Sequence, residues 1–117
     1  MMKTVIKLEE LGLFMLGIYL FDQMEYAWWW FLVLILVPDL SVIGYVFGDK
    51  MGALSYNIAH HRGIAVVLYL IGIYYSHTAI QLLGVILFAH SAMDRMLGYG
   101  LKYETGFKYT HLGEIGK

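Results

Sequence analysis

The sequence contains no cysteine, a single proline and few charged side chains. Without cysteine there is no disulfide framework, no thiol nucleophile and no thiolate metal site. Charged residues make up 15% and hydrophobic residues 60% of the 117 residues, against about 45–50% apolar residues in a typical soluble domain. A water-soluble domain of this length has too little interior to hide so much apolar surface. We therefore expect a single transmembrane domain, residues 1–117, with much of its surface in lipid.

Several motifs that define common enzyme classes are also missing. The chain has no Walker motif, no H-E-x-x-H and no G-x-S-x-G, so nucleotide chemistry and classical hydrolase chemistry have no support. The net charge of −1 gives no argument for nucleic acid as a partner. The first apolar stretch lacks a small-residue cleavage pattern, so we interpret it as a retained helix and not as a signal peptide.

Four apolar segments follow one another along the chain, and each is close to the roughly 20 residues that a membrane helix needs. The predicted spans cover about 5–21, 27–47, 53–75 and 78–97. They predict an all-α, membrane-embedded four-helix bundle with short loops and a glycine-rich C-terminal arm at 98–117. Three tryptophans at the start of the second segment are typical of an interfacial aromatic anchor.

The distribution of Lys and Arg predicts the orientation of these spans. The loops at 22–26 and 76–78 carry no Lys or Arg, whereas basic residues gather at the chain start, the other turns and the tail. By the positive-inside rule, the chain is a multi-pass protein with both termini in the cytoplasm.

Three glycines at four-residue spacing, Gly44, Gly48 and Gly52, allow two interpretations. Small residues at this spacing let two membrane helices approach closely. Gly48, Asp49 and Lys50 also read as a turn. We favour the turn at 48–50.

The stretch Leu87–Lys102 carries the strongest candidate site. His90 and Asp94 lie four residues apart and share one helix face. They can act as metal ligands, as a base with its orienting acid, or as a structural hydrogen-bonded pair. Arg95 and Lys102 follow, and both can hold a phosphate or another anionic headgroup at the cytoplasmic edge.

The predicted topology carries other ionisable side chains to the same depth. Asp39 and His90 each lie about 12 residues below the outer end of their span, which is roughly 18 Å, and His60 lies near the cytoplasmic start of the third span. An ionisable group in lipid is costly unless it is paired or hydrated. We therefore predict that Asp39, His60, His90 and Asp94 converge on one site in the inner half of the bilayer, with Glu9 as a fifth member.

Each of these residues also has a structural interpretation. Asp39 can cap a helix that opens after Pro38, although this proline also kinks the span and frees backbone carbonyls. Glu9 can pair with Lys7 or Lys50 at the interface. The remaining histidines are expected at the surface: His61 with Arg62 toward headgroups, His77 in the outer turn and His111 in the tail.

At PDLSVIGYVFG, SYNIAH and AHSAMDRMLGYGLKYETGFKYTHLGEIG the chain resembles the DUF4260 family of small bacterial integral membrane proteins. The resemblance covers nearly the whole chain. It implies a multi-span protein of the bacterial inner membrane and no established activity. It supports singling out seven positions: Asp39, Asn57, His60, His90, Asp94, Arg95 and His111. A looser resemblance is to membrane-bound metal-dependent hydrolases.

Two functions from different classes fit these residues. The first is a metal-dependent membrane enzyme acting on a lipid or another amphiphile, with Asp39, His60, His90, Asp94 and Arg95 as its catalytic set. Two histidines and two carboxylates suit Zn²⁺, Fe²⁺ or Mn²⁺, and the absence of soft ligands excludes Cu(I). The second is a carrier, a proton relay or an accessory subunit in which the same residues form a polar network without metal. The expected partners are membrane lipids and, as an option, a second copy of the chain.

Overall fold

The computed structural model describes residues 1–101 and 109–114. Its helices are α1 (Met2–Asp22), α2 (Trp28–Leu34), the 3₁₀-helix η1 (Val37–Phe47), α3 (Asp49–His60), α4 (Arg62–Tyr74) and α5 (Thr78–Met96). A two-residue antiparallel ladder follows, in which β1 (Tyr109–Thr110) pairs with β2 (Gly113–Glu114). The fold is therefore helical as predicted, and the ladder is a small departure from an all-α chain.

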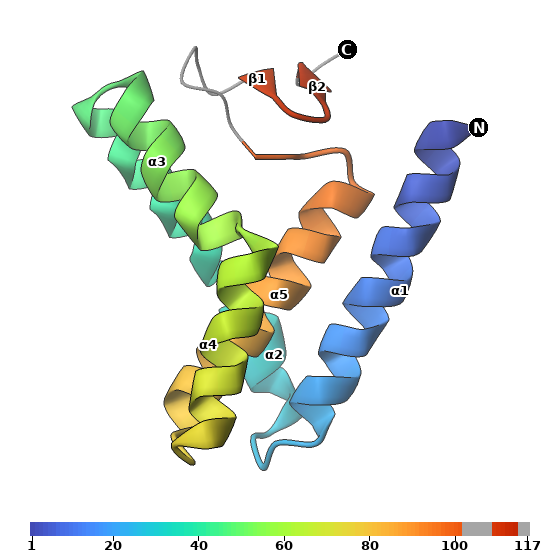
Figure 1. The fold of residues 1–117 in the computed structure, drawn as a ribbon, viewed down its shortest axis with the longest axis vertical. Helices are drawn as coiled ribbons and strands as arrows, with labels where there is room; N and C mark the ends of the chain where they lie inside the picture. Colours follow the sequence, from blue (N-terminus) through green and yellow to red (C-terminus); the bar gives the residue numbers. More distant parts are fainter. Residues whose placement is uncertain (102–108, 115–117) are drawn as a thin grey trace.

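Helix α5 is the central element, because α1 and α4 both pack along it and α3 also contacts it (Figure 1). Every residue from Gly84 to Ala92 is buried, which no other helix achieves over the part of the chain that the structure describes. Apolar side chains of α1, α2 and α5 form the main core, which contains Phe21, Phe31, Ile35, Val85, Ile86 and Ala89. The most buried stretch of α5 leads directly into His90 and Asp94.

Helices α4 and α5 approach each other at two glycines. A Cβ atom on Gly84 would lie 2.5 Å from the backbone nitrogen of Tyr69, and one on Gly72 would collide with the backbone of Gln81. Small residues at such crossings let two helix backbones come close together. This close contact fixes α4 and α5 as one antiparallel pair.

The predicted third span is not one helix. The structure ends α3 at His60 and begins α4 at Arg62, with His61 in an extended conformation (φ −82°, ψ 117°). The side chain of His61 accepts a hydrogen bond from Ile64 N at 3.2 Å, so it caps the start of α4. The extended backbone at His61 separates α3 from α4, so the predicted span 53–75 is interrupted in its middle.

The glycines at 44, 48 and 52 combine both sequence interpretations. Gly48 has φ +109° between η1 and α3, a conformation that favours glycine, so the predicted turn is confirmed. A Cβ atom on Gly44 would collide with Ser55, and one on Gly52 would collide with the ring of Tyr45. The two outer glycines therefore let η1 and α3 pack closely as a hairpin.

Within the described residues, the segment Trp28–Phe47 is long and apolar enough to cross a membrane by its length and composition, with a mean hydropathy of 2.1. It contains α2 and η1. Large apolar side chains are also exposed on other helices, among them Leu8, Met15, Leu54, Leu70 and Ile73. The start of α1 and the β1–β2 ladder lie at the same end of the molecule, and the α1–α2 and α4–α5 loops lie at the opposite end (Figure 1).

Candidate metal centre

Four side chains from three elements meet at one point. Asp39 comes from η1, His60 from the end of α3, and His90 and Asp94 from α5, and one ligand atom of each lies within 4.8 Å of the others. His60 and His90 are almost completely buried and Asp94 is 9% exposed. The side chain of Asp39 is 51% exposed. The predicted convergence of these four residues is therefore confirmed, and the cluster is accessible on the side of Asp39.

The contacts inside the cluster all join a histidine Nε2 to a carboxylate oxygen. His90 Nε2 lies 3.0 Å from Asp39 Oδ1 and 3.3 Å from Asp94 Oδ2. His60 Nε2 lies 3.4 Å from Asp39 Oδ1 and 3.3 Å from Asp94 Oδ2. Two nitrogen atoms and two oxygen atoms thus alternate around a common centre.

The only proline of the chain orients His90. In η1 the N–H of Asp39 donates to Leu36 O at 3.1 Å, and Pro38 has no N–H that could donate to Ile35 O in the same 3₁₀ pattern. The carbonyl of Ile35 is therefore left for the Nδ1–H of His90, which donates to it. The expectation that a proline kink frees a backbone carbonyl beside the site is met at this atom.

His60 is oriented by the preceding turn of its own helix. Its Nδ1–H donates to Tyr56 O at 2.8 Å, and its ring stacks on the ring of Tyr56 with centroids 3.8 Å apart and planes 7° apart. The hydroxyl of Tyr56 donates to Asp94 Oδ2 at 3.2 Å. One tyrosine thus holds both a histidine and an aspartate of the cluster in place.

Asp94 occupies the last turn of α5. Gly98 ends the helix with φ +95°, while Tyr99 N donates to Asp94 O at 2.7 Å and Gly98 N donates to Arg95 O at 3.2 Å. This pair of bonds is the Schellman arrangement, which requires a left-handed residue after the helix. The glycine-rich sequence after Arg95 therefore stops α5 immediately beyond the cluster.

The backbone contacts decide which nitrogen of each histidine faces the centre. Because both Nδ1 atoms donate to carbonyls, a neutral imidazole must present its Nε2 lone pair to the carboxylates. Two lone pairs facing two carboxylates at 3.0–3.4 Å repel the carboxylate oxygens unless a metal cation lies between them or protons are held on the rings or the carboxylates. His60 Nε2 is buried and has no hydrogen-bond partner of acceptable geometry in the described residues.

The donor set and its spacing fit a metal ion. Neighbouring ligands at about 2.0–2.1 Å from one ion lie roughly 3.3 Å apart, and the four nitrogen–oxygen separations here are 3.0–3.4 Å, while the whole set of ligand atoms lies within 4.8 Å. Two neutral histidines and two carboxylates carry a charge of −2, which one divalent cation neutralises. Metal-bound histidines typically donate their second N–H to a carbonyl or carboxylate, as His60 and His90 do.

Glu9, the predicted fifth member, does not belong to the cluster. Its side chain is exposed on α1, whereas the adjacent Glu10 is buried. Glu10 accepts two hydrogen bonds from Arg62, at 2.7 and 2.9 Å. This bidentate pair joins α1 to the start of α4, so Arg62 lies against protein and not toward headgroups as we had predicted.

The other predicted residues lie around the cluster and not within it. Arg95 is half-buried and lines a small cavity with His60 and Asp94. Lys102, predicted to hold an anion with Arg95, lies outside the described residues. His61 and His77 are exposed, as predicted, and each accepts a hydrogen bond at the start of a helix.

His111 folds back toward the end of α5. Its Nδ1 accepts a hydrogen bond from Leu101 N at 2.8 Å, and its own N–H donates to Leu101 O at 3.0 Å. Burial is the main cause that lowers the pKa of His111, and the charge of Arg95 adds to it. His111 is therefore held as a neutral ring outside the cluster.

Tyr56 is the site residue that the sequence interpretation missed. Its position four residues before His60 places both on one helix face, and this spacing was the available signal. Glu10 was also missed, because two adjacent glutamates differ only in which side of α1 they face.

Taken together, these features define a small helical protein with a buried two-histidine, two-aspartate cluster at the junction of interrupted helices. The chain belongs to the DUF4260 family, described as a domain of unknown function, because the family model matches residues 3–115. Comparison with curated proteins and with solved structures finds no match.

Proposed function

We propose that this protein is an integral membrane protein that binds one divalent metal ion through Asp39, His60, His90 and Asp94, and that the metal serves an enzyme acting on a lipid-like substrate. The observation that carries the proposal is the commitment of both histidine Nδ1 atoms to backbone carbonyls. That commitment leaves two Nε2 lone pairs facing two carboxylates, an arrangement that favours a cation at the centre.

The ligand types narrow the choice of metal. Two imidazoles and two carboxylates without a thiolate suit Zn²⁺, Fe²⁺ or Mn²⁺. A bound ion of this kind activates water or polarises a carbonyl or phosphoryl oxygen. The half-exposed Asp39 leaves a side from which water or substrate can approach, and a carboxylate at that position can also accept a proton. Arg95 beside Asp94 supplies positive charge for an anionic group.

The membrane part of the proposal rests on apolar surface. Trp28–Phe47 has the length and composition of a span, and exposed apolar side chains extend over the other helices. Large apolar side chains exposed on so many helices are unusual for a soluble monomer. We infer four spans near residues 5–21, 27–47, 53–75 and 78–97 in a bacterial inner membrane, with both termini cytoplasmic and the cluster near the cytoplasmic leaflet. The third span is bent at His61.

The contact between His90 Nε2 and Asp39 Oδ1 favours a second function. At 3.0 Å it has hydrogen-bond geometry, which suits a protonated ring. In that case both histidines are imidazolium ions paired with the two aspartates, and the cluster is a proton relay or a structural network without metal. Metal content separates the two functions.

The test is elemental analysis of protein purified without chelator. We expect about one equivalent of a first-row divalent metal per chain, because the four ligand atoms lie within 4.8 Å of one another and surround one centre. His60→Ala should lose most of the metal, whereas the matched variant His61→Ala should keep it, because His61 only caps α4. Folded wild-type protein without metal would refute the metal site. The polar network then predicts that Asp39→Asn is tolerated better than His90→Ala.

A further inference from the structure

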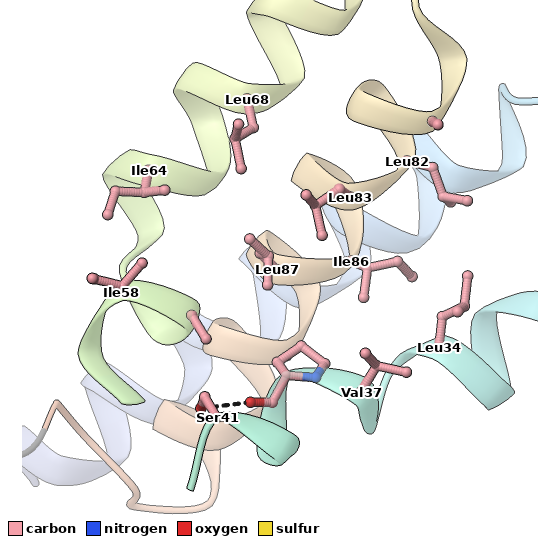
Figure 2. A pocket seen from close by; sticks show the side chains of 13 residues that line it. Leu34, Val37, Ser41, Ile58, Ile64, Leu68, Leu82, Leu83, Ile86 and Leu87 are labelled. Carbon is pink, nitrogen blue, oxygen red and sulfur yellow. Dashed lines mark hydrogen bonds between the residues drawn. The ribbon is translucent and has the colours of Figure 1, made fainter. Parts of the chain in front are cut away.

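An apolar groove lies between η1, the α3–α4 junction and α5. Its volume is about 550 Å³. Figure 2 shows the side chains that line it, which come from all of these elements and from the end of α2. They include Leu34, Val37, Ile58, Ile64, Leu83 and Leu87. The lining is hydrocarbon apart from Ser41, whose hydroxyl donates to Pro38 O at 2.7 Å (Figure 2).

One end of the groove adjoins the metal centre. Pro38 and Ala59 both line it, and they directly precede Asp39 and His60 in the sequence. Asp39 is also the cluster member with the most exposed side chain. A molecule in the groove can therefore place its end beside the four ligands.

The dimensions and the apolar lining of the groove fit the hydrocarbon chain of a small ligand. Along α5 its lining runs from Ala79 to Leu87, which is about 12 Å at 1.5 Å per residue. The volume of about 550 Å³ lies within the roughly 300–1,000 Å³ of pockets that hold small ligands. The hydroxyl hydrogen of Ser41 is already donated to Pro38 O, so it is not available to a polar occupant.

We propose that this groove binds the hydrocarbon chain of a single-chain anionic amphiphile, with the headgroup at the Asp39 end and the methyl end near Ala79. The headgroup end adjoins the site proposed for the metal cation, where Asp39 has the most exposed side chain of the four ligands, so an anionic headgroup can approach that cation there. This inference rests on the proposed function and specifies its substrate class. In this arrangement the groove selects the hydrocarbon chain of the substrate, and the cluster acts on its headgroup.

The experiment uses the full chain in phosphatidylcholine nanodiscs and two photoreactive palmitic acids, one with a diazirine near the carboxylate and one with it near the methyl end. After irradiation, mass spectrometry locates and quantifies the labelled residues. We expect saturable labelling by both probes. The carboxylate-end probe should label residues near Ile58 and Ala59, and the methyl-end probe should label residues near Leu82 and Leu83.

Two matched variants test whether the groove itself is responsible. Leu83 lines the groove and Leu70 does not, although both side chains are exposed, at 46% and 57%. Leu83→Trp should fill the groove and lose the saturable labelling, and Leu70→Trp should retain it. Labelling that is not saturable, is spread over all apolar faces, has the reverse orientation or survives in Leu83→Trp would overturn the proposal. If Leu83 is found crosslinked to a second copy of the chain and the palmitic acids give no saturable labelling, the proposal is overturned too.

Metal analysis of the same samples keeps the two proposals separate. If the protein holds metal but shows no saturable labelling, the metal proposal stands and the proposal that the groove binds a hydrocarbon chain is refuted. Protein that is labelled as expected but lacks metal retains the groove and refutes the metal site. Retention of wild-type metal content by Leu83→Trp shows that this variant is folded around the cluster.

Discussion

Replacing Pro38 with alanine should weaken metal binding, although Pro38 is not a ligand. The change adds a backbone N–H at the one position in η1 where its absence leaves Ile35 O free for His90. In a 3₁₀ pattern the new N–H donates to Ile35 O. In an α-helical pattern the N–H of Asp39 does so instead. Either bond competes with His90 Nδ1 for the same carbonyl.

The expected size of the effect follows from the role of such contacts. A carbonyl that orients a ligating histidine fixes both its tautomer and its ring plane, and losing that contact typically weakens metal affinity about 10–100-fold. This corresponds to roughly 1.4–2.7 kcal/mol of binding free energy. Overall stability should change less, because the proline removed from the helix is replaced by a residue of higher helix propensity.

The measurement is competition between the purified protein and a chromophoric chelator for Zn²⁺. Ser41→Ala is the matched control, because it removes the hydroxyl that donates to Pro38 O and leaves the proline in place. We expect affinity near the wild-type value for Ser41→Ala. A Pro38→Ala affinity within about twofold of wild type, the usual range of a neutral change, would refute the argument that the proline orients His90.

Three further predictions concern stability and pH. Glu10→Gln should lower the free energy of unfolding by about 3 kcal/mol, because it leaves the largely buried Arg62 without its carboxylate. Glu9→Gln should change it by no more than about 0.5 kcal/mol. Equal effects of the two variants in denaturant titration would contradict the assignment of Glu10 as the partner of Arg62. Gly84→Ala should cost about 1–3 kcal/mol by overpacking the α4–α5 crossing, and Gly12→Ala, with open space around it, should be neutral or stabilising in the same titration. Because the pKa of His111 is lowered in the folded chain, its neutral form favours the folded state. Its contribution to the free energy of unfolding is therefore present above the unfolded pKa of about 6.5 and is lost as the pH falls below that value. The hydrogen-exchange protection factor of the Leu101 N–H, which His111 Nδ1 accepts, should fall on acidification, and a protection factor that does not change with pH would exclude this role.

Hydrophobic patterning in the sequence located the outer helices well. The segments 5–21 and 78–97 correspond to α1 (Met2–Asp22) and α5 (Thr78–Met96). The break in 53–75 was not predicted, because histidine is not among the usual capping residues and apolar length alone suggests continuity. At this break His60 is the last residue of α3, and His61 caps the start of α4.

The convergence of the four cluster residues was predictable because buried ionisable groups must find partners. The choice between Glu9 and Glu10 was not predictable, since the sequence does not say which face of α1 meets Arg62. The role of Tyr56 depends on how closely its ring lies on His60, which is a matter of packing and not of spacing. The predicted roles of the cluster as metal ligands and catalytic residues remain predictions that the experiments above address.

The order of the cluster residues along the chain has a consequence for biogenesis. Asp39 and His60 are synthesised before α5, which brings both His90 and Asp94. Chains emerge and fold from the N-terminus, so a nascent chain that ends before α5 has one aspartate and one histidine at this position, and their partners are missing. The cluster is therefore completed in a single late step, when α5 inserts between α1 and α4. A chain truncated before α5 therefore leaves Asp39 and His60 without the two partners that α5 supplies.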